Sequence, residues 1–331
     1  MIPLAPLDLG AIFNGAFATV GRYWKQLFGI GAVVYGAVAV LVATAILIAY
    51  ASVSGELHAV IHLGRDEDPT TEQIVPLVVA FGVVWLVCAL VAMVSTAMMY
   101  AAVPAVLQDA VLGRPVTFGA VWRRATSRLP AVIGTVLLVC LIVFVPVLLL
   151  MGAVVATMIA VISMDNDATP VLLISVGLLG AAATGPLSVW LAVKFSLAPT
   201  AAVFEEQRPV AALRRSALLV RGEWWRVFGI TALAGIVASA VSYFVQLPFS
   251  FFGMLPGAAG MSGLGPDPDP VSVMFAMGGY LIVMAVGLLV SQFATSVLPP
   301  LVTGLLYVDR RIRTEDLAPV LVEAAASDPP R

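Results

Sequence analysis

Six long runs without a charged side chain constrain this chain more than any other feature. They cover residues 26–55, 73–108, 129–164, 168–193, 227–266 and 270–308. Each run exceeds the about 20 apolar residues that a helix needs to cross a hydrocarbon core about 30 Å thick. Because lipid offers the backbone no hydrogen-bond partners, such runs are expected to be helical. The sequence therefore predicts an all-α integral membrane protein with six transmembrane helices.

The composition excludes an ordinary water-soluble domain. Hydrophobic residues make up 61% of the chain and charged residues 11%, against about 45–50% and about 25% in soluble domains. The start of the chain, MIPLAPLDLGAIFNGAFATVG, has no basic n-region and its apolar residues are periodic rather than continuous, so no cleaved signal peptide is predicted. Cys88 and Cys140 lie inside apolar runs, so we expect inert thiols and neither a disulfide nor a metal site.

The positive charges are distributed unevenly among the segments between the runs. The chain has 17 Lys and Arg residues, and 15 of them precede the first, third or fifth run or follow the sixth. The alternate loops hold only Arg65, and Lys194 lies just past the fourth run. Since Lys and Arg mark the cytoplasmic side of a membrane, both termini are predicted to be cytoplasmic.

Three similar segments precede the odd-numbered runs. They read PLDLGAIFNGAFATVGRYWKQLFG from Pro6, PVTFGAVWRRATSRLPAVIG from Pro115 and PVAALRRSALLVRGEWWRVFG from Pro209. Each begins with proline and a branched aliphatic residue, continues as an amphipathic helix and becomes apolar near a glycine. The even-numbered runs close on proline and then reach an acid: Asp109, Glu205 or Asp309. The chain is therefore predicted to contain three tandem parallel repeats, each a cytoplasmic amphipathic helix followed by a transmembrane hairpin.

The predicted boundaries follow from this pattern. Repeat 1 covers 1–107, with an interfacial helix at 8–25 and spans at 27–53 and 74–106. Repeat 2 covers 108–204, with an interfacial helix at 117–129 and spans at 130–163 and 170–203. Repeat 3 covers 205–308, with an interfacial helix at 209–226 and spans at 227–253 and 271–307. Residues 309–331 are predicted to be a cytoplasmic tail.

Three stretches carry a resemblance to a known family. PLDLGAIFNGAFATVGRYW, SLAPTAAVFEEQRPVAALRRSALLVRGEWWRVFG and LLYVDRRIRTEDL resemble bacterial membrane proteins related to the membrane domain of glycerophosphoryl diester phosphodiesterases. The resemblance covers nearly the whole chain. It implies a multi-pass protein of the bacterial plasma membrane, of the kind common in high-GC Gram-positive bacteria.

The same resemblance carries no catalytic residue over to this chain. The phosphodiesterase chemistry of the wider family belongs to a fused soluble barrel with a metal site rich in histidine and carboxylate. This sequence lacks a His-Arg-Gly start, and His58 and His62 are its only histidines. We therefore expect no enzymatic activity, no catalytic residue and no cofactor.

The basic amphipathic segments predict a lipid interface. A Lys or Arg near anionic headgroups contributes on the order of 1 kcal/mol, and tryptophan prefers the membrane boundary. The residues expected there are Arg123, Arg124, Arg128, Arg214, Arg215, Arg221, Trp224, Trp225 and Arg226. The expected partners are anionic lipids on the cytoplasmic side and a membrane protein, with no nucleic acid.

A second set of residues is polar or helix-breaking within the predicted spans: Lys194, Gly185, Pro186, Gln246 and Gln292. Lys194 either extends to the interface, pairs with a carboxylate such as Glu205, or serves a ligand. Gly185–Pro186 either allows close packing with a kink or opens the helix at a binding site. The two glutamines form either interhelical hydrogen bonds or ligand contacts.

Two functions follow from these two sets. The basic interface predicts a non-enzymatic scaffold or accessory protein that binds lipid and membrane partners. The intramembrane polar set supports an alternative, a small transporter or lipid-handling channel. His58 and His62 are four positions apart beside acidic residues, but without a third defined ligand they do not predict a metal site.

Overall fold

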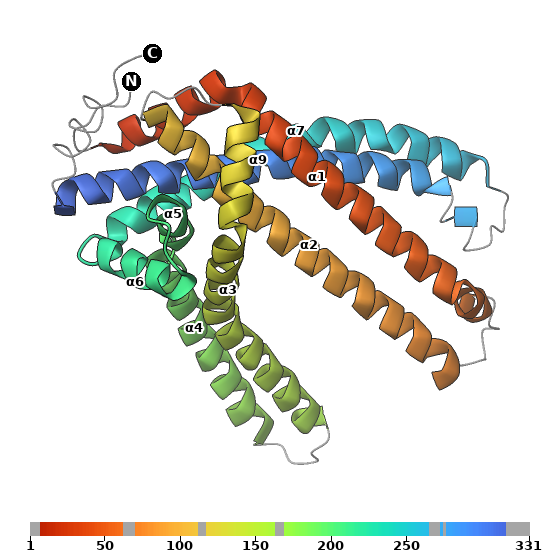
Figure 1. The fold of residues 1–331 in the computed structure, drawn as a ribbon. Helices are drawn as coiled ribbons and strands as arrows, with labels where there is room; N and C mark the ends of the chain where they lie inside the picture. The colour runs from red at the N-terminus through yellow and green to blue at the C-terminus, as the bar shows by residue number, and fades with distance from the viewer. Residues whose placement is uncertain are drawn as a thin grey trace. The chain divides into compact units, whose positions relative to one another are not determined.

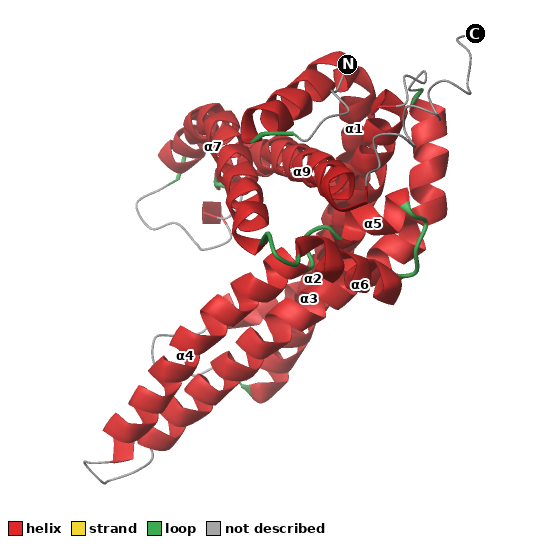
Figure 2. Cartoon of the chain, turned by 90° about the vertical axis from the view of Figure 1, so that its left-hand side faces the viewer, coloured by secondary structure: helices red, strands yellow, loops and turns green. Residues whose placement is uncertain are grey.

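The described chain is entirely helical apart from short turns. The structure is a computed structural model, and it describes residues 7–61, 70–111, 117–162, 169–264, 272–273 and 276–315. None of these residues lies in a β-strand (Figure 2). The all-α prediction is therefore confirmed for this part of the chain.

Eight helices carry the described structure (Figure 1). Their bounds are α1 (Leu9–Ile61), α2 (Thr71–Val111), α3 (Phe118–Ile162), α4 (Thr169–Lys194), α5 (Ala198–Phe204), α6 (Pro209–Val220), α7 (Trp224–Ser262) and α9 (Gly278–Glu315). Six segments are long and apolar enough to cross a membrane: Leu9–Val60, Thr71–Gln108, Phe118–Val155, Ala182–Phe204, Trp224–Ser262 and Gly278–Thr314. This number agrees with the six predicted spans and fits a multi-pass membrane protein.

The chain divides into two compact units. Unit 1 comprises Met1–Arg22, Tyr100–Leu233 and Pro300–Arg331, and unit 2 comprises Tyr23–Met99 and Ala234–Pro299. Four helices, α1, α2, α7 and α9, contribute one part to each unit. In α1 the division coincides with a kink at Tyr23, where φ is −112° and ψ is 25°.

Unit 1 contains a core of small and aliphatic side chains. The end of α2 is buried from Ala101 to Leu107 and is rich in alanine. The last part of α9 contributes Leu301, Leu305 and Tyr307, all fully buried. Within the same unit, α3 and α4 lie side by side as a hairpin (Figure 1). The short helix α6 contacts both of them.

Unit 2 is held together by close approach and by interhelical hydrogen bonds. At Gly287 of α9, an added Cβ would lie 2.6 Å from Phe249 Cβ of α7, so only glycine permits this approach. Ser242 Oγ of α7 donates to the Ser291 carbonyl oxygen of α9 at 2.7 Å. Such bonds satisfy polar groups that lipid cannot.

The helix boundaries differ from the predicted ones at the interfacial segments. The segment predicted as a helix over 8–25 forms the first part of α1 and is followed by the kink at Tyr23, close to its predicted end. The segment predicted over 117–129 is not a separate element, because α3 continues through Pro130. The third, predicted at 209–226, ends earlier at Val220. Arg221 has an extended backbone, with φ −60° and ψ 130°, which stops the helix. Gly222 follows with a φ of +84°, a left-handed conformation that glycine adopts without strain. The predicted tail beyond Glu315 lies outside the described residues.

Candidate functional site

The site begins where α4 is interrupted. The fourth span was predicted as one helix over 170–203, but α4 ends at Lys194 and a turn occupies 195–197 before α5. The cause is Pro199, which has no N–H to donate to the Phe195 carbonyl oxygen four residues earlier and whose ring crowds that oxygen. Ala198 N–H donates to this oxygen instead, at 3.1 Å. The break leaves the last carbonyl groups of α4 available to other partners.

Helix α6 supplies one of those partners. Pro209 starts it at a position where the missing N–H is tolerated. One face of α6 is buried: Ala212, Leu213, Ser216, Leu219 and Val220. From this face Ser216 Oγ donates to the Lys194 carbonyl oxygen at 2.8 Å. The hydrogen bond links α6 to the end of α4 and leaves Arg214 and Arg221 on the exposed side of α6.

The turn after α6 brings a tryptophan to the same place. Gly222 and Glu223 form the connection, and Trp224 starts α7. Trp224 Nε1 donates to the Trp190 carbonyl oxygen of α4 at 3.4 Å. The indole of Trp224 also stacks on Phe228, one turn along α7, with ring centroids 5.2 Å apart. The start of α7 is thereby fixed against α4.

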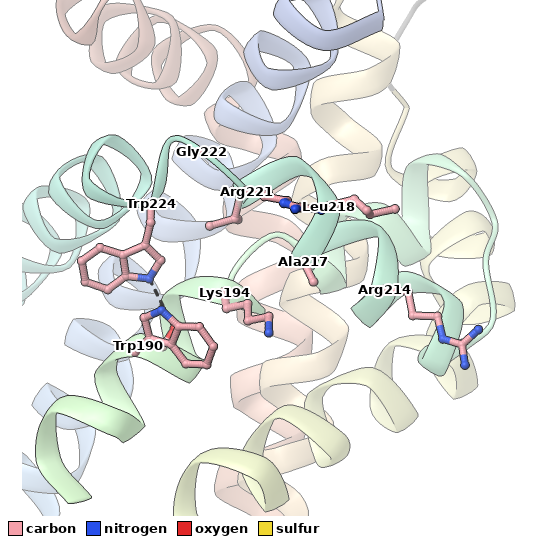
Figure 3. Close-up of a pocket in the computed structure, with 9 residues that line it drawn as sticks. Trp190, Lys194, Arg214, Ala217, Leu218, Arg221, Gly222 and Trp224 are labelled. Carbon is pink, nitrogen blue, oxygen red and sulfur yellow. Dashed lines mark hydrogen bonds between the residues drawn. The ribbon is translucent and has the colours of Figure 1, made fainter. Parts of the chain in front are cut away.

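These elements enclose a groove of about 620 Å³, which we call the basic groove. It is lined by Trp190, Lys194, Arg214, Ala217, Leu218, Val220, Arg221, Gly222 and Trp224. Figure 3 shows the two tryptophans at one end, Arg214 at the other, and Lys194 and Arg221 between them. All lining residues belong to unit 1. The groove therefore combines three cations with two large aromatic side chains.

The three cations of the basic groove have no carboxylate partner among the described residues. Lys194 Nζ lies 4.5 Å from the ring centroid of Trp190 and 5.7 Å from that of Phe195. Such cation–π contacts stabilise the ammonium group without neutralising it. Lys194 also occupies the last turn of α4, where the helix dipole favours a positive charge.

Glu205 is not the partner of Lys194, because other groups hold it. Arg215 Nε–H donates to Glu205 Oε1 at 2.9 Å and to Oε2 at 3.1 Å. Tyr307 O–H donates to Oε1, and Gln207 Nε2 donates to Oε2 at 2.7 Å. Arg311 Nε lies 3.6 Å from Oε1. We call these five residues the Glu205 cluster.

A second carboxylate is fully buried at the end of α9. Asp309 has a side-chain exposure of 0%, accepts from Leu7 N–H at 2.8 Å, and accepts from Arg313 Nε–H at 2.9 Å. Arg226 Nη1 lies 3.0 Å from its other oxygen. Arg226 Nη2 also donates to the Leu7 carbonyl oxygen at 2.7 Å. This Asp309 cluster joins the first described residue to the start of α7 and the end of α9.

The structure thus separates the predicted interface residues into two groups. Arg215 and Arg226 are balanced by Glu205 and Asp309, and Arg128 pairs with Glu206. Arg123 and Trp225 are exposed, and Arg124 is half-buried. Arg214, Arg221 and Trp224 line the basic groove together with Lys194. Residues predicted for two different roles therefore meet at one site.

The other predicted intramembrane residues do not join this groove. Gly185 and Pro186 are exposed within α4, which continues through both without opening. In unit 2, Gln246 Oε1 accepts from Ser291 Oγ at 3.3 Å, which agrees with the interhelical hydrogen bond expected for this residue. Gln292 is exposed.

Sequence reasoning overlooked Trp190 and Tyr307. Trp190 precedes Lys194 by four positions, a spacing that places both side chains on one face of a helix, so a signal for it was present. Tyr307 meets Glu205 across 102 positions of sequence, and no local pattern indicates that contact.

No group of three metal-ligating side chains occurs within the described ranges; His58 lies in α1, and His62 lies outside those ranges. The described site therefore consists of a basic groove with aromatic walls, flanked by two carboxylate clusters.

Comparison of the chain with protein-family models, with curated proteins and with solved structures gives no match, so its function has to be argued from this site.

Proposed function

We propose that this chain is a non-enzymatic accessory protein of the cytoplasmic membrane, which binds anionic lipid and one or more membrane proteins. One observation carries the proposal: Lys194, Arg214 and Arg221 share a groove and no described carboxylate neutralises them. Cations that the protein leaves unbalanced are available to an anionic ligand. The resemblance to the membrane domain of glycerophosphoryl diester phosphodiesterases supports the same setting.

The position of the basic groove favours lipid as the ligand. It lies where α4 ends, within the candidate span Ala182–Phe204, and where α7, the candidate span Trp224–Ser262, begins. Tryptophan at such a boundary is typical of the headgroup region. The positive charge on this side makes it the cytoplasmic side, where anionic lipid attracts basic segments by about 1 kcal/mol per Lys or Arg.

The contacts of the two carboxylates support a structural role for Glu205 and Asp309. Glu205 and Asp309 both receive charge-assisted hydrogen bonds from arginine, the strong kind that fixes geometry. The oxygens of a carboxylate held in this way are occupied by donors of the protein. The basic groove therefore supports binding better than acid–base chemistry.

Lipid selection tests the proposal directly. The purified protein would be placed in nanodiscs of equal parts phosphatidylcholine and phosphatidylglycerol, and the lipids retained after gentle detergent extraction identified by mass spectrometry. We expect phosphatidylglycerol to be enriched by the natural chain and not by a Lys194→Ala/Arg214→Ala/Arg221→Ala variant. Arg208→Ala is the matched control, because Arg208 is exposed at the start of α6 but does not line the groove. Equal retention of both lipids by the natural chain would contradict the proposal.

The partner half of the proposal needs its own measurement. Trp225 is 77% exposed beside the groove-lining Trp224. A photo-crosslinking side chain introduced at this position in intact membranes would identify neighbouring membrane proteins. We expect one or a few reproducible crosslinked proteins. A random sample of abundant membrane proteins would argue against a scaffold role.

The alternative, a small transporter or lipid-handling channel, has less support. It relied on an opening at Gly185–Pro186, where α4 is continuous. Lys194 remains its strongest element. Lipid scrambling in liposomes that is lost in a folded Lys194→Ala variant would favour this alternative over the accessory role.

A further inference from the structure

We propose that the basic groove is a site for a lipid headgroup with two phosphate groups, a diphosphatidyl lipid, rather than for single-phosphate headgroups. The inference rests on the proposed lipid binding and makes it more specific. It follows from the spacing of the cations, the absence of acids from the groove lining, and the apolar surface beside it.

The spacing separates the cations into two positions. Arg214 lies in the second turn of α6 and Arg221 is the extended residue that follows its last residue, Val220, so about 10 Å of helix rise separates the two backbone positions at 1.5 Å per residue. Arg214 lies at the end of the groove remote from the tryptophans, whereas Arg221 and Lys194 lie nearer to them (Figure 3). A single phosphate bound at one of these positions leaves the other position available for a second phosphate. Two phosphates joined by a short linker can occupy both together.

The charge balance agrees with two phosphates. No acidic side chain lines the groove. Glu223 is the nearest acid along the chain, and its carboxylate lies 3.9 Å from Arg310 Nη1. The groove thus presents three positive charges to a ligand. A headgroup with two phosphodiester groups carries two negative charges and balances them better than a headgroup with one phosphodiester group. Basic pockets between membrane helices bind headgroups with several phosphates for this reason.

The surroundings of the groove indicate a lipid rather than a soluble bisphosphate. Leu187 and Val189 of α4, one turn or more from Lys194, are 47% and 45% exposed. Leu218, which lines the groove, is 63% exposed. Apolar side chains left exposed beside a charged site provide surface for acyl chains. A water-soluble ligand would make no use of them.

A titration by native mass spectrometry tests the inference. The full chain in detergent micelles would be titrated with diphosphatidylglycerol and, separately, with phosphatidylglycerol at equal total phosphate. We expect diphosphatidylglycerol to bind at least about fivefold more tightly, the gain from one additional cation contact of about 1 kcal/mol. Arg214→Ala should remove this preference, because it removes one of the two phosphate positions. Arg208→Ala should leave the preference unchanged.

The outcomes separate the inference from the function on which it rests. Equal binding of the two lipids per phosphate, both above phosphatidylcholine, would overturn the two-phosphate site and leave anionic-lipid binding intact. Binding of neither above phosphatidylcholine would overturn both proposals. Binding of fructose 1,6-bisphosphate that displaces diphosphatidylglycerol would identify a soluble ligand and overturn the lipid assignment. Unchanged thermal unfolding of Arg214→Ala would show that loss of binding is not loss of folding.

Discussion

Two adjacent arginines of α6 have opposite environments. Arg215 faces Glu205 and forms two hydrogen bonds with it, whereas Arg214 is exposed and lines the basic groove. They differ by one position, which on a helix is a rotation of about 100°. That rotation places one guanidinium in an internal cluster and leaves the other for a ligand.

The same contrast between paired and unpaired positive charges applies to the whole site. In the Glu205 and Asp309 clusters, every positive charge named lies beside a carboxylate, and all groups except the exposed Arg313 are buried or half-buried. In the basic groove, three positive charges lie beside aromatic rings or solvent. The first arrangement stabilises the fold, and the second leaves cations that can interact with an anionic ligand. Mutations should therefore affect stability in one region and binding in the other.

The largest expected effect on stability is at Asp309. Asp309→Ala leaves Arg226 and Arg313 without their carboxylate and Leu7 N–H without its acceptor. Removing one partner of a buried charge pair typically costs about 3–5 kcal/mol. We expect a loss of this size in the free energy of unfolding, measured by denaturant titration in mild micelles.

Glu206→Gln is the matched control for Asp309→Ala. Glu206 pairs with Arg128, but its side chain is 65% exposed, so the pair is screened by solvent. A change close to zero is expected. A loss at Glu206 equal to that at Asp309 would show that burial does not distinguish these pairs.

A smaller effect is expected at Glu205. Glu205→Gln keeps the shape of the side chain but weakens the hydrogen bonds from Arg215 by removing the charge. Hydrogen bonds to charged groups contribute about 1.5–3 kcal/mol, so a loss in that range is expected in the same titration. Binding of anionic lipid by the folded fraction should persist. Loss of lipid binding at unchanged stability would place Glu205 in the binding site instead.

How far the sequence predicted these features depends on the range of the interactions. The six apolar helices were predictable because lipid forces the backbone to satisfy its own hydrogen bonds, which leaves a local, continuous signal. The break after Lys194 also has a local cause in Pro199, although 170–203 was predicted to be one span. The contacts of Asp309 were not predictable, since Leu7 lies 302 positions away.

The same distinction applies to the candidate site. Lys194, Arg214, Arg221 and Trp224 were singled out by residue type, but in two separate groups. Only the packing of α6 against the end of α4 brings them together. Conversely, Arg215 and Arg226 look identical to Arg214 in sequence. Their partners are set by the helix rotation and by tertiary contacts, which composition does not reveal.

The smallest expected effect on stability within the clusters is at Tyr307. Tyr307→Phe removes the O–H that donates to Glu205 and keeps the ring that packs against Phe204, with centroids 5.5 Å apart. Loss of one hydrogen bond of several on the same carboxylate should cost about 1–2 kcal/mol in the free energy of unfolding. A loss as large as that of Asp309→Ala would mean that the tyrosine, not arginine, is the main partner of Glu205.

The most direct test of the central claim compares Arg214→Ala with Arg215→Ala in one experiment that records unfolding and retained lipid for each. We expect Arg214→Ala to unfold like the natural chain and to lose anionic lipid about fivefold. We expect Arg215→Ala to be destabilised, with a folded fraction that retains the lipid. Equal losses of lipid, or a destabilised Arg214→Ala variant, would contradict the separation between the carboxylate clusters and the basic groove.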